Sequence, residues 1–128
     1  MNWMLIVSGF LAAFCTVGHF IIGGRRYLRP MLDAGFDAVP KKIMHSAFHY
    51  VSVDFVISTV VLLAVGFGLT WGYDLVPAAF VVALHFLLYA VVQLIIAFSS
   101  GIQKAPLKMF QWTLFLMTGV FGLLGVLL

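Results

Sequence analysis

The sequence contains no glutamate and few charged residues of any kind. Asp, Lys and Arg make up 9% of its 128 residues, whereas about a quarter of a typical soluble domain is charged. The absence of glutamate excludes the metalloprotease motif in which a Glu base lies between two histidines. It also excludes the paired Glu and Glu-x-x-His ligands of carboxylate-bridged di-iron bundles. With so little charge, the chain has almost no surface suited to water.

Cysteine is represented by a single residue, Cys15, so an intrachain disulfide is impossible. Together with Ser8, Ala12 and His19 it forms one seam at helical spacing, and we expect it to be a small packing residue. No nucleophile–base pair can be placed in the sequence, so nothing in it supports an enzyme. The first four residues carry no Lys or Arg, unlike the start of a signal peptide, and we expect the first apolar run to be retained as a transmembrane helix.

Long apolar runs dominate what is present. Hydrophobic residues make up 64% of the chain, and the mean hydropathy is +1.17. A helix needs roughly 20 apolar residues to cross a bilayer, and four segments meet that length: 3–22, 40–68, 76–98 and 105–127. Their unbroken runs lack the alternating pattern of a transmembrane barrel strand. The sequence predicts an all-α integral membrane protein, an up-down-up-down four-helix bundle in which residues 1–128 form a single transmembrane domain.

Positive charge is distributed unevenly between the predicted connections. All seven Lys and Arg residues lie in or beside the first and third connections. The second connection, residues 68–74, carries instead two aromatics that favour the membrane interface, Trp71 and Tyr73. The positive-inside rule predicts both termini outside the cytoplasm, and we expect the membrane to be a bacterial inner membrane. The basic residues of the first connection are also candidates for binding anionic lipid headgroups: Arg25, Arg26, Arg29, Lys41 and Lys42.

Polar side chains within the predicted spans are the candidate functional residues, because they are costly in hydrocarbon. The helical rise places most of them in the cytoplasmic half of the membrane, with His19 and His49 at a similar depth. Asp54 points about 140° away from His49 on the same helix, so these two side chains are not expected to line the same spot. The full set is His19, His45, His49, Asp54, His85, Tyr89, Gln93 and Gln111.

The first functional hypothesis is a cofactor, metal or small-ligand site that opens from the cytoplasmic side. Imidazoles on facing helices can hold haem iron, and Gly18 beside His19 would let a porphyrin approach the backbone. The candidate ligands of such a cofactor, haem b or a transition metal, are His19, His49 and His85. For a metal alone, His19, His45 and His49 are the candidate set. A structural hydrogen bond between His19 and His49 is the alternative.

Two further hypotheses stay open. A channel or a proton-linked transporter of small solutes would need several copies of the chain, because four helices alone enclose little space. Its path would use Asp54, His85, Tyr89, Gln93 and Gln111. A non-catalytic accessory subunit of a membrane complex would use the same polar groups as contacts between helices. The expected partners are therefore membrane lipid and either further copies of the chain or another membrane subunit, and not nucleic acid.

Overall fold

The structure is a computed structural model that describes residues 1–69, 72 and 74–128. Within this part of the chain every regular element is a helix, which confirms the all-α prediction. The elements are α1 (Trp3–Gly18), the π-helix η1 (His19–Leu28), α2 (Arg29–Asp33), α3 (Ala38–Phe67), α4 (Val76–Ser99), α5 (Ala105–Lys108) and α6 (Gln111–Leu127). Trp71 and Tyr73, the two aromatics of the predicted second connection, lie outside the described residues.

The first three elements form one unbroken helix from Trp3 to Asp33. This helix passes the predicted end of the first span at residue 22 and continues through Arg25 and Arg26. It can do so because long basic side chains reach water or headgroups while their backbone stays helical. The change from α- to π-helix falls at His19, and π-helical segments are rare and frequently found at functional sites.

The predicted fourth span, residues 105–127, is not one continuous helix. The short α5 ends at Lys108, and α6 begins at Gln111 after a turn. The indole of Trp112 donates a hydrogen bond of 2.9 Å to the carbonyl oxygen of Pro106. In a continuous helix that oxygen would accept from the backbone amide four residues further on. The side chain therefore replaces a backbone partner where the helix is interrupted.

In the described chain, three helices are long and apolar enough to cross a membrane: Trp3–Asp33, Ala38–Phe67 and Val76–Ser99. α6 is apolar but shorter. Large apolar side chains also point outward along these helices, for example Phe14 and Ile95, which are 63% and 62% exposed. An outer surface this apolar indicates a membrane protein.

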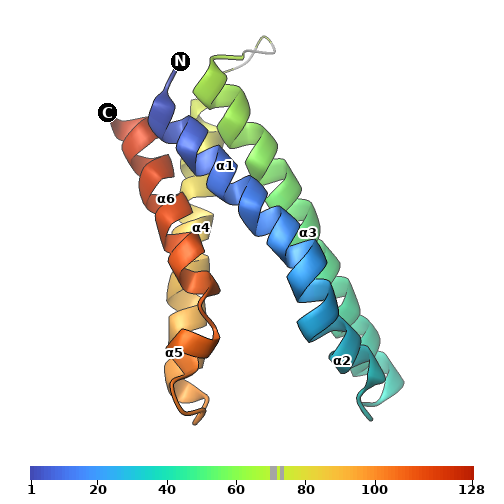
Figure 1. The fold of residues 1–128 in the computed structure, drawn as a ribbon. Helices are drawn as coiled ribbons and strands as arrows, with labels where there is room; N and C mark the ends of the chain where they lie inside the picture. The colour runs from blue at the N-terminus through green and yellow to red at the C-terminus, as the bar shows by residue number, and fades with distance from the viewer. Residues whose placement is uncertain (70–71, 73) are drawn as a thin grey trace.

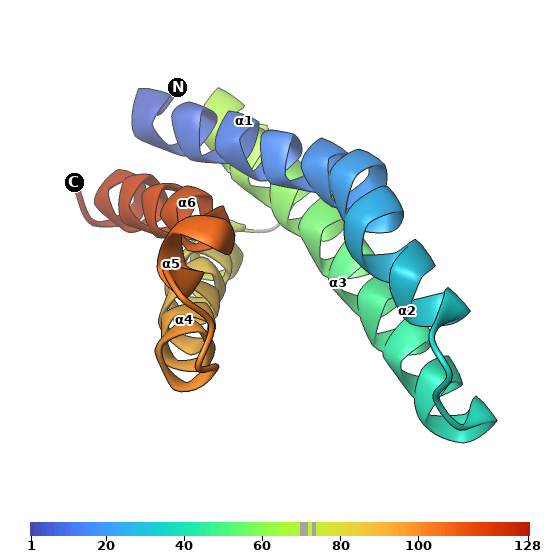
Figure 2. The same cartoon turned by 60° about the horizontal axis from the view of Figure 1, so that its bottom comes forward.

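The helices form two pairs, which we call the first arm and the second arm. In the first arm, α1, η1 and α2 run alongside α3, and in the second arm α4 packs on α5 and α6. The arms meet near the two chain termini, where α1 packs against α6, and they diverge towards α2 and α5 (Figure 1 and Figure 2). The molecule is therefore V-shaped, with a closed end at the termini and an open end at the basic residues.

Asn2 ties three helices together at the closed end. Its side-chain oxygen accepts hydrogen bonds from the backbone amides of Met4 and Leu5, at 3.1 and 3.2 Å, and so caps α1. Its Nδ2 donates to the carbonyl of Gly125 in α6 at 2.6 Å. Its backbone N–H donates to the carbonyl of Gly66 in α3 at 2.7 Å. These contacts need backbones that approach closely, which the small residues of membrane helices permit.

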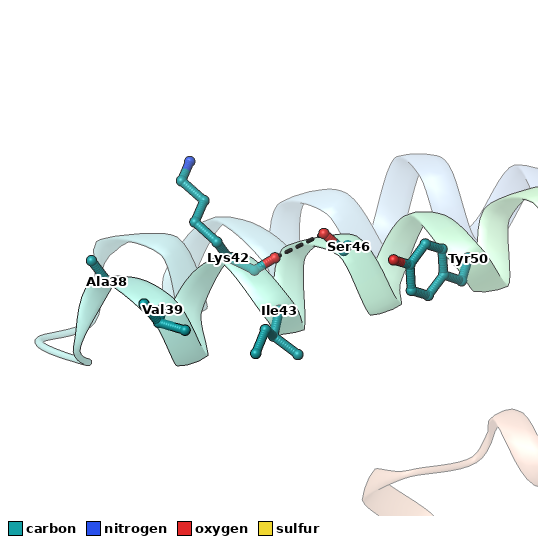
Figure 3. Close-up of a pocket in the computed structure, with 6 residues that line it drawn as sticks. All are labelled: Ala38, Val39, Lys42, Ile43, Ser46 and Tyr50. Carbon is teal, nitrogen blue, oxygen red and sulfur yellow. Dashed lines mark hydrogen bonds between the residues drawn. The ribbon is translucent and has the colours of Figure 1, made fainter.

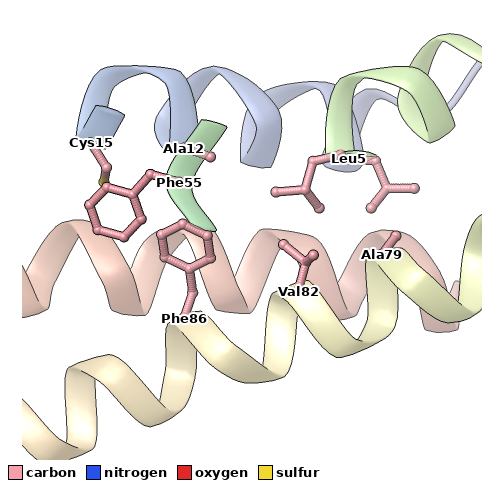
Figure 4. Packing of buried hydrophobic residues seen from close by; sticks show 8 residues of the cluster. Leu5, Ala12, Cys15, Phe55, Ala79, Val82 and Phe86 are labelled. Carbon is pink, nitrogen blue, oxygen red and sulfur yellow. The ribbon is translucent and has the colours of Figure 1, made fainter. Parts of the chain in front are cut away.

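The core lies between the arms, next to the closed end. Figure 4 shows Phe55 of α3 beside Phe86 of α4, with ring centroids 5.7 Å apart. Ser8 is fully buried, and its hydroxyl donates to the carbonyl of Thr118 across the contact of α1 with α6 at 2.7 Å. The other members of the buried apolar cluster are Leu5, Ala12, Cys15, Leu62, Ala79 and Val82.

Candidate functional site: a cleft between the arms

A cleft of about 430 Å³ lies between the two arms on the open side of the core. Small-molecule sites in proteins occupy about 300–1,000 Å³, so this volume is sufficient for a ligand. Apolar side chains from both arms form most of its wall, among them Phe14, Phe55 and Leu114. Among the described residues that line it there is no Lys, Arg, Asp or Glu. The hydrogen-bonding side chains in the wall are His19, Tyr27, Tyr89, Gln93 and Gln111.

His19 borders the cleft from the first arm, at the first position of η1. Its Nε2 lies 3.0 Å from the hydroxyl of Ser52 and 3.1 Å from the carbonyl oxygen of Phe48. The imidazole stacks on the ring of Phe48, with centroids 4.0 Å apart. These contacts hold the His19 ring in a fixed position against α3.

A chain of hydrogen bonds joins the two arms across the cleft. Nε2 of Gln93 in α4 donates to Oε1 of Gln111 in α6 at 2.9 Å. Nε2 of Gln111 then donates to the hydroxyl of Tyr27 in η1 at 2.9 Å. Oε1 of Gln93 is enclosed and accepts no hydrogen bond from any described atom. We call these three side chains the glutamine chain.

Asp54, His85 and Tyr89 form a second polar group where α3 faces α4. The Tyr89 hydroxyl donates to Oδ2 of Asp54 at 3.1 Å, and Nδ1 of His85 lies 4.0 Å from Oδ1 of Asp54. Tyr89 borders the cleft, whereas Asp54 and His85 keep 30% and 49% of their side-chain surface exposed. The residues predicted to form one polar path are therefore divided between this group and the glutamine chain.

The predicted cofactor and metal ligands are not gathered in one place. Nε2 of His49 lies 3.2 Å from Nε2 of His45, one turn away on α3. His85 lies against Asp54. Of the four histidines, all of them described, His19 alone borders the cleft. Within the described ranges, no group of three His, Cys, Asp or Glu side chains is placed to hold a metal ion.

The predicted headgroup-binding residues lie at the open end of the first arm. Arg25 and Arg26 belong to η1, Arg29 begins α2, and Lys41 and Lys42 lie near the start of α3. All of them are exposed except Lys41, which is half-buried. Their contact with lipid headgroups stays a prediction.

A shallow groove on the outside of α3 is a weaker candidate than the cleft. Every residue of its wall comes from this one helix (Figure 3). The Ser46 hydroxyl donates to the carbonyl of Lys42 at 3.0 Å, which is a contact within the helix. One helix cannot enclose a ligand, so the cleft is the better site. The groove residues are Ala38, Val39, Lys42, Ile43, Ser46 and Tyr50.

Two residues of the cleft region do not stand out in the sequence: Tyr27 and Phe48. Tyr27 follows two arginines and reads as part of a basic loop, and only the continuation of the helix through residue 28 brings it to the cleft. Phe48 and Ser52 are one helical turn apart, and this spacing is the available signal for the face of α3 that packs on His19.

The function has to be argued from the cleft itself, because no protein-family model, no curated protein and no solved structure matches this chain.

Proposed function

We propose that this chain is an integral membrane protein of four spans whose cleft binds a small lipophilic ligand. The open end carries the Lys and Arg residues of both arms, so the positive-inside rule favours a cleft that opens towards the cytoplasm. The observation that carries the proposal is the cleft itself. It is an apolar hollow of about 430 Å³ with hydrogen-bonding side chains from both arms in its wall.

The position of the cleft favours a ligand that arrives from the bilayer. Two residues of its wall, Phe14 and Val92, are also 63% and 52% exposed. They belong to helices that are long and apolar enough to span a membrane. An apolar molecule could pass from lipid into such a cleft without crossing water. A strongly hydrated molecule would lose its hydrogen bonds to water on entering the cleft and would find few hydrogen-bonding partners there.

A small ligand is favoured over the haem and metal versions of the hypothesis. Of the four histidines, His19 is the one that borders the cleft, and its Nε2 is already placed for hydrogen bonds to Ser52 and Phe48. Coordination of iron or another metal through that nitrogen would displace these two partners. The polar residues of the wall therefore suit hydrogen bonding to a ligand better than coordination.

Photolabelling in vesicles tests the proposal. A long-chain alkyl probe that carries a diazirine is added to the protein in phosphatidylcholine vesicles, and labelled residues are mapped by mass spectrometry. Labelling of cleft residues from both arms, Ile22 and Leu114, is expected to saturate. An excess of the long-chain alkyl compound without the diazirine should displace the probe from these residues. Labelling of the outward residues Val60 and Leu88 should rise in proportion to the probe, because these residues meet bulk lipid. Proportional labelling at Ile22 and Leu114 as well would rule out a specific site.

Transport is the second candidate, and the V shape of the molecule favours it. The two arms diverge towards one end, while the contact of Asn2 with Gly125 closes the other (Figure 1). A site open to one side is what alternating access requires of one of its two states. Asp54 is linked to the cleft wall by the hydrogen bond that it accepts from Tyr89, and Nδ1 of His85 lies 4.0 Å from its carboxylate.

Asp54→Asn tests a proton-linked mechanism. The substitution conserves the volume of the side chain but removes the carboxylate that would take up a proton. Proton flux into vesicles under an imposed pH gradient, followed with an enclosed pH-sensitive dye, is expected to fall to the level of protein-free vesicles. Asp33→Asn, at the exposed end of α2, is the matched control and should keep the wild-type flux. The same flux in wild type and both variants would leave Asp54 without a role in conduction.

A further inference from the structure

We propose that the ligand of the cleft is a neutral lipid whose polar end carries a hydroxyl group. This inference rests on the proposed function of the cleft and names the chemistry of its ligand. Three observations carry it: the charge of the wall, the enclosed acceptor on Gln93 and the direction of the glutamine chain.

The charge of the wall favours a neutral polar end. The described residues that line the cleft include no Lys, Arg, Asp or Glu. An ionised headgroup placed there would have no opposite charge to pair with, and burying an unpaired charge is strongly unfavourable. Arg25 and Arg26 are exposed on the first arm and are not part of the wall. A lipid with an uncharged polar end therefore suits the cleft better than an anionic one.

Gln93 supplies an acceptor for that polar end. Its Nε2 is occupied by Gln111 at 2.9 Å, while its Oε1 is shielded from water and has no donor among the described atoms. Buried acceptors in proteins nearly always have a partner. An unpaired one beside an apolar cleft points to a partner that arrives with the ligand. Gln93 borders the cleft and the terminal torsion of glutamine is broad, so rotation of the amide can present Oε1 to the ligand at the expense of the hydrogen bond from Nε2 to Gln111.

The direction in which the hydrogen bonds of the glutamine chain are donated decides whether the ligand must supply a donor or an acceptor. Gln111 uses its Oε1 for Gln93 and its Nε2 for Tyr27. Both amides therefore donate towards Tyr27, and the free end of the chain at Gln93 is an acceptor. A hydroxyl hydrogen can be donated to that end, whereas an ether or ketone oxygen has no hydrogen to donate.

Four matched long-chain compounds test the inference on the wild-type protein in vesicles. Each compound competes with the diazirine probe for the saturable label at Ile22 and Leu114. The four compounds are an alkyl alcohol, its methyl ether, the corresponding methyl ketone and the corresponding carboxylate. The alcohol is expected to compete at a concentration about three- to tenfold lower than the ether, which is the ratio that one net hydrogen bond supplies. Because no variant is involved, this result does not depend on how a substitution affects folding.

The Gln93→Met variant tests whether the preference for the alcohol over the ether comes from the side-chain amide of Gln93. Methionine has a similar length and lacks the amide oxygen, so the alcohol and the ether should compete equally while both still displace the probe. Gln103→Met is the matched control, because Gln103 is exposed in the turn before α5 and is not part of the wall. This variant should keep the preference for the alcohol, and loss of the preference in both variants would contradict a role for Gln93.

The competition results separate failure of the inference from failure of the proposed function. Equal competition by the alcohol and the ether would overturn the hydroxyl assignment and leave an apolar site in place. Stronger competition by the ketone would mean that the glutamine chain runs in the opposite direction. Stronger competition by the carboxylate would mean that an anionic headgroup is bound, and each of these two results also overturns the assignment. If none of the four compounds displaces the label, the proposed function of the cleft itself fails.

Discussion

Replacing Gly66 by alanine is expected to lower the free energy of unfolding by about 1–3 kcal/mol, the usual cost of an added carbon in a closely packed contact. A Cβ on Gly66 would lie 2.8 Å from the backbone nitrogen of Ile6 and 3.1 Å from the carbonyl carbon of Leu5. Both atoms belong to the backbone of α1, so rotation of a side chain cannot relieve the overlap. α1 must move away from α3, and this movement weakens the hydrogen bond from the Asn2 N–H to the Gly66 carbonyl.

Gly125→Ala is expected to have a similar effect on the contact between the arms. Its Cβ would lie 3.0 Å from the backbone nitrogen of Leu5 and 2.7 Å from the Leu5 Cγ. α6 would then be displaced from α1, and the 2.6 Å hydrogen bond from Asn2 Nδ2 to the Gly125 carbonyl would be disturbed. Because α1 and α6 meet where the V is closed, this substitution should also change the width of the cleft.

Thermal unfolding in detergent, followed by circular dichroism, measures both effects. Gly24→Ala is the matched control, because nothing in the described chain lies within 4 Å of the Cβ that Gly24 would gain. An alanine in place of a helical glycine is expected to stabilise the protein by up to about 1 kcal/mol. Equal unfolding temperatures for Gly66→Ala, Gly125→Ala and Gly24→Ala would contradict the close approach of the helices at the closed end.

Gly18→Trp is expected to abolish the saturable labelling of the cleft by the alkyl probe. Gly18 borders the cleft, and within the described residues nothing lies within 4 Å of the Cβ position there. An indole at this position would extend into the cleft without having to displace a neighbour. Tryptophan has the largest of the standard side chains, so it should exclude much of any ligand from a space of about 430 Å³.

Gly24→Trp is the control for this experiment. Gly24 also has open space around its Cβ position in the described chain, but it is not part of the cleft wall. This variant should keep the wild-type saturation of the label at Ile22 and Leu114, and circular dichroism checks that both variants keep their helical content. Saturation of the label at wild-type probe concentrations in Gly18→Trp would mean that the probe binds outside the cleft.

The sequence by itself determined the helical class of this protein and the buried face of its first helix. Long apolar runs with little charge leave the helix as the way to pair backbone groups in lipid, and the described chain is helical, with three helices of spanning length. Of the four residues of the predicted seam, Ser8, Ala12 and Cys15 are buried and His19 is half-buried. Helical spacing is a local property of the chain, so the sequence is sufficient to identify such a face.

Helix boundaries followed hydropathy less closely. The apolar run of the first span ends at residue 22, yet the helix continues to Asp33, because basic side chains are compatible with a helix that leaves the membrane. The fourth apolar run is continuous in composition but is interrupted between Lys108 and Gln111, where Trp112 hydrogen-bonds to Pro106. Hydropathy reports where a segment can lie and does not report such a side-chain contact.

Only the tertiary structure decided which polar residues meet. His19 and His49 lie at a similar predicted depth, yet His19 contacts Ser52 of α3 and His49 contacts its helical neighbour His45. Spacing along one helix fixes the angle between two of its side chains, but it does not fix how that helix is rotated against its neighbours or how two pairs of helices diverge. The contact of Asn2 with Gly125 joins the arms at the closed end, whereas further along the arms are joined by side chains, such as those of Tyr27 and Gln111. The arms separate beyond the core, and a cleft, rather than closely packed side chains, lies beside His19.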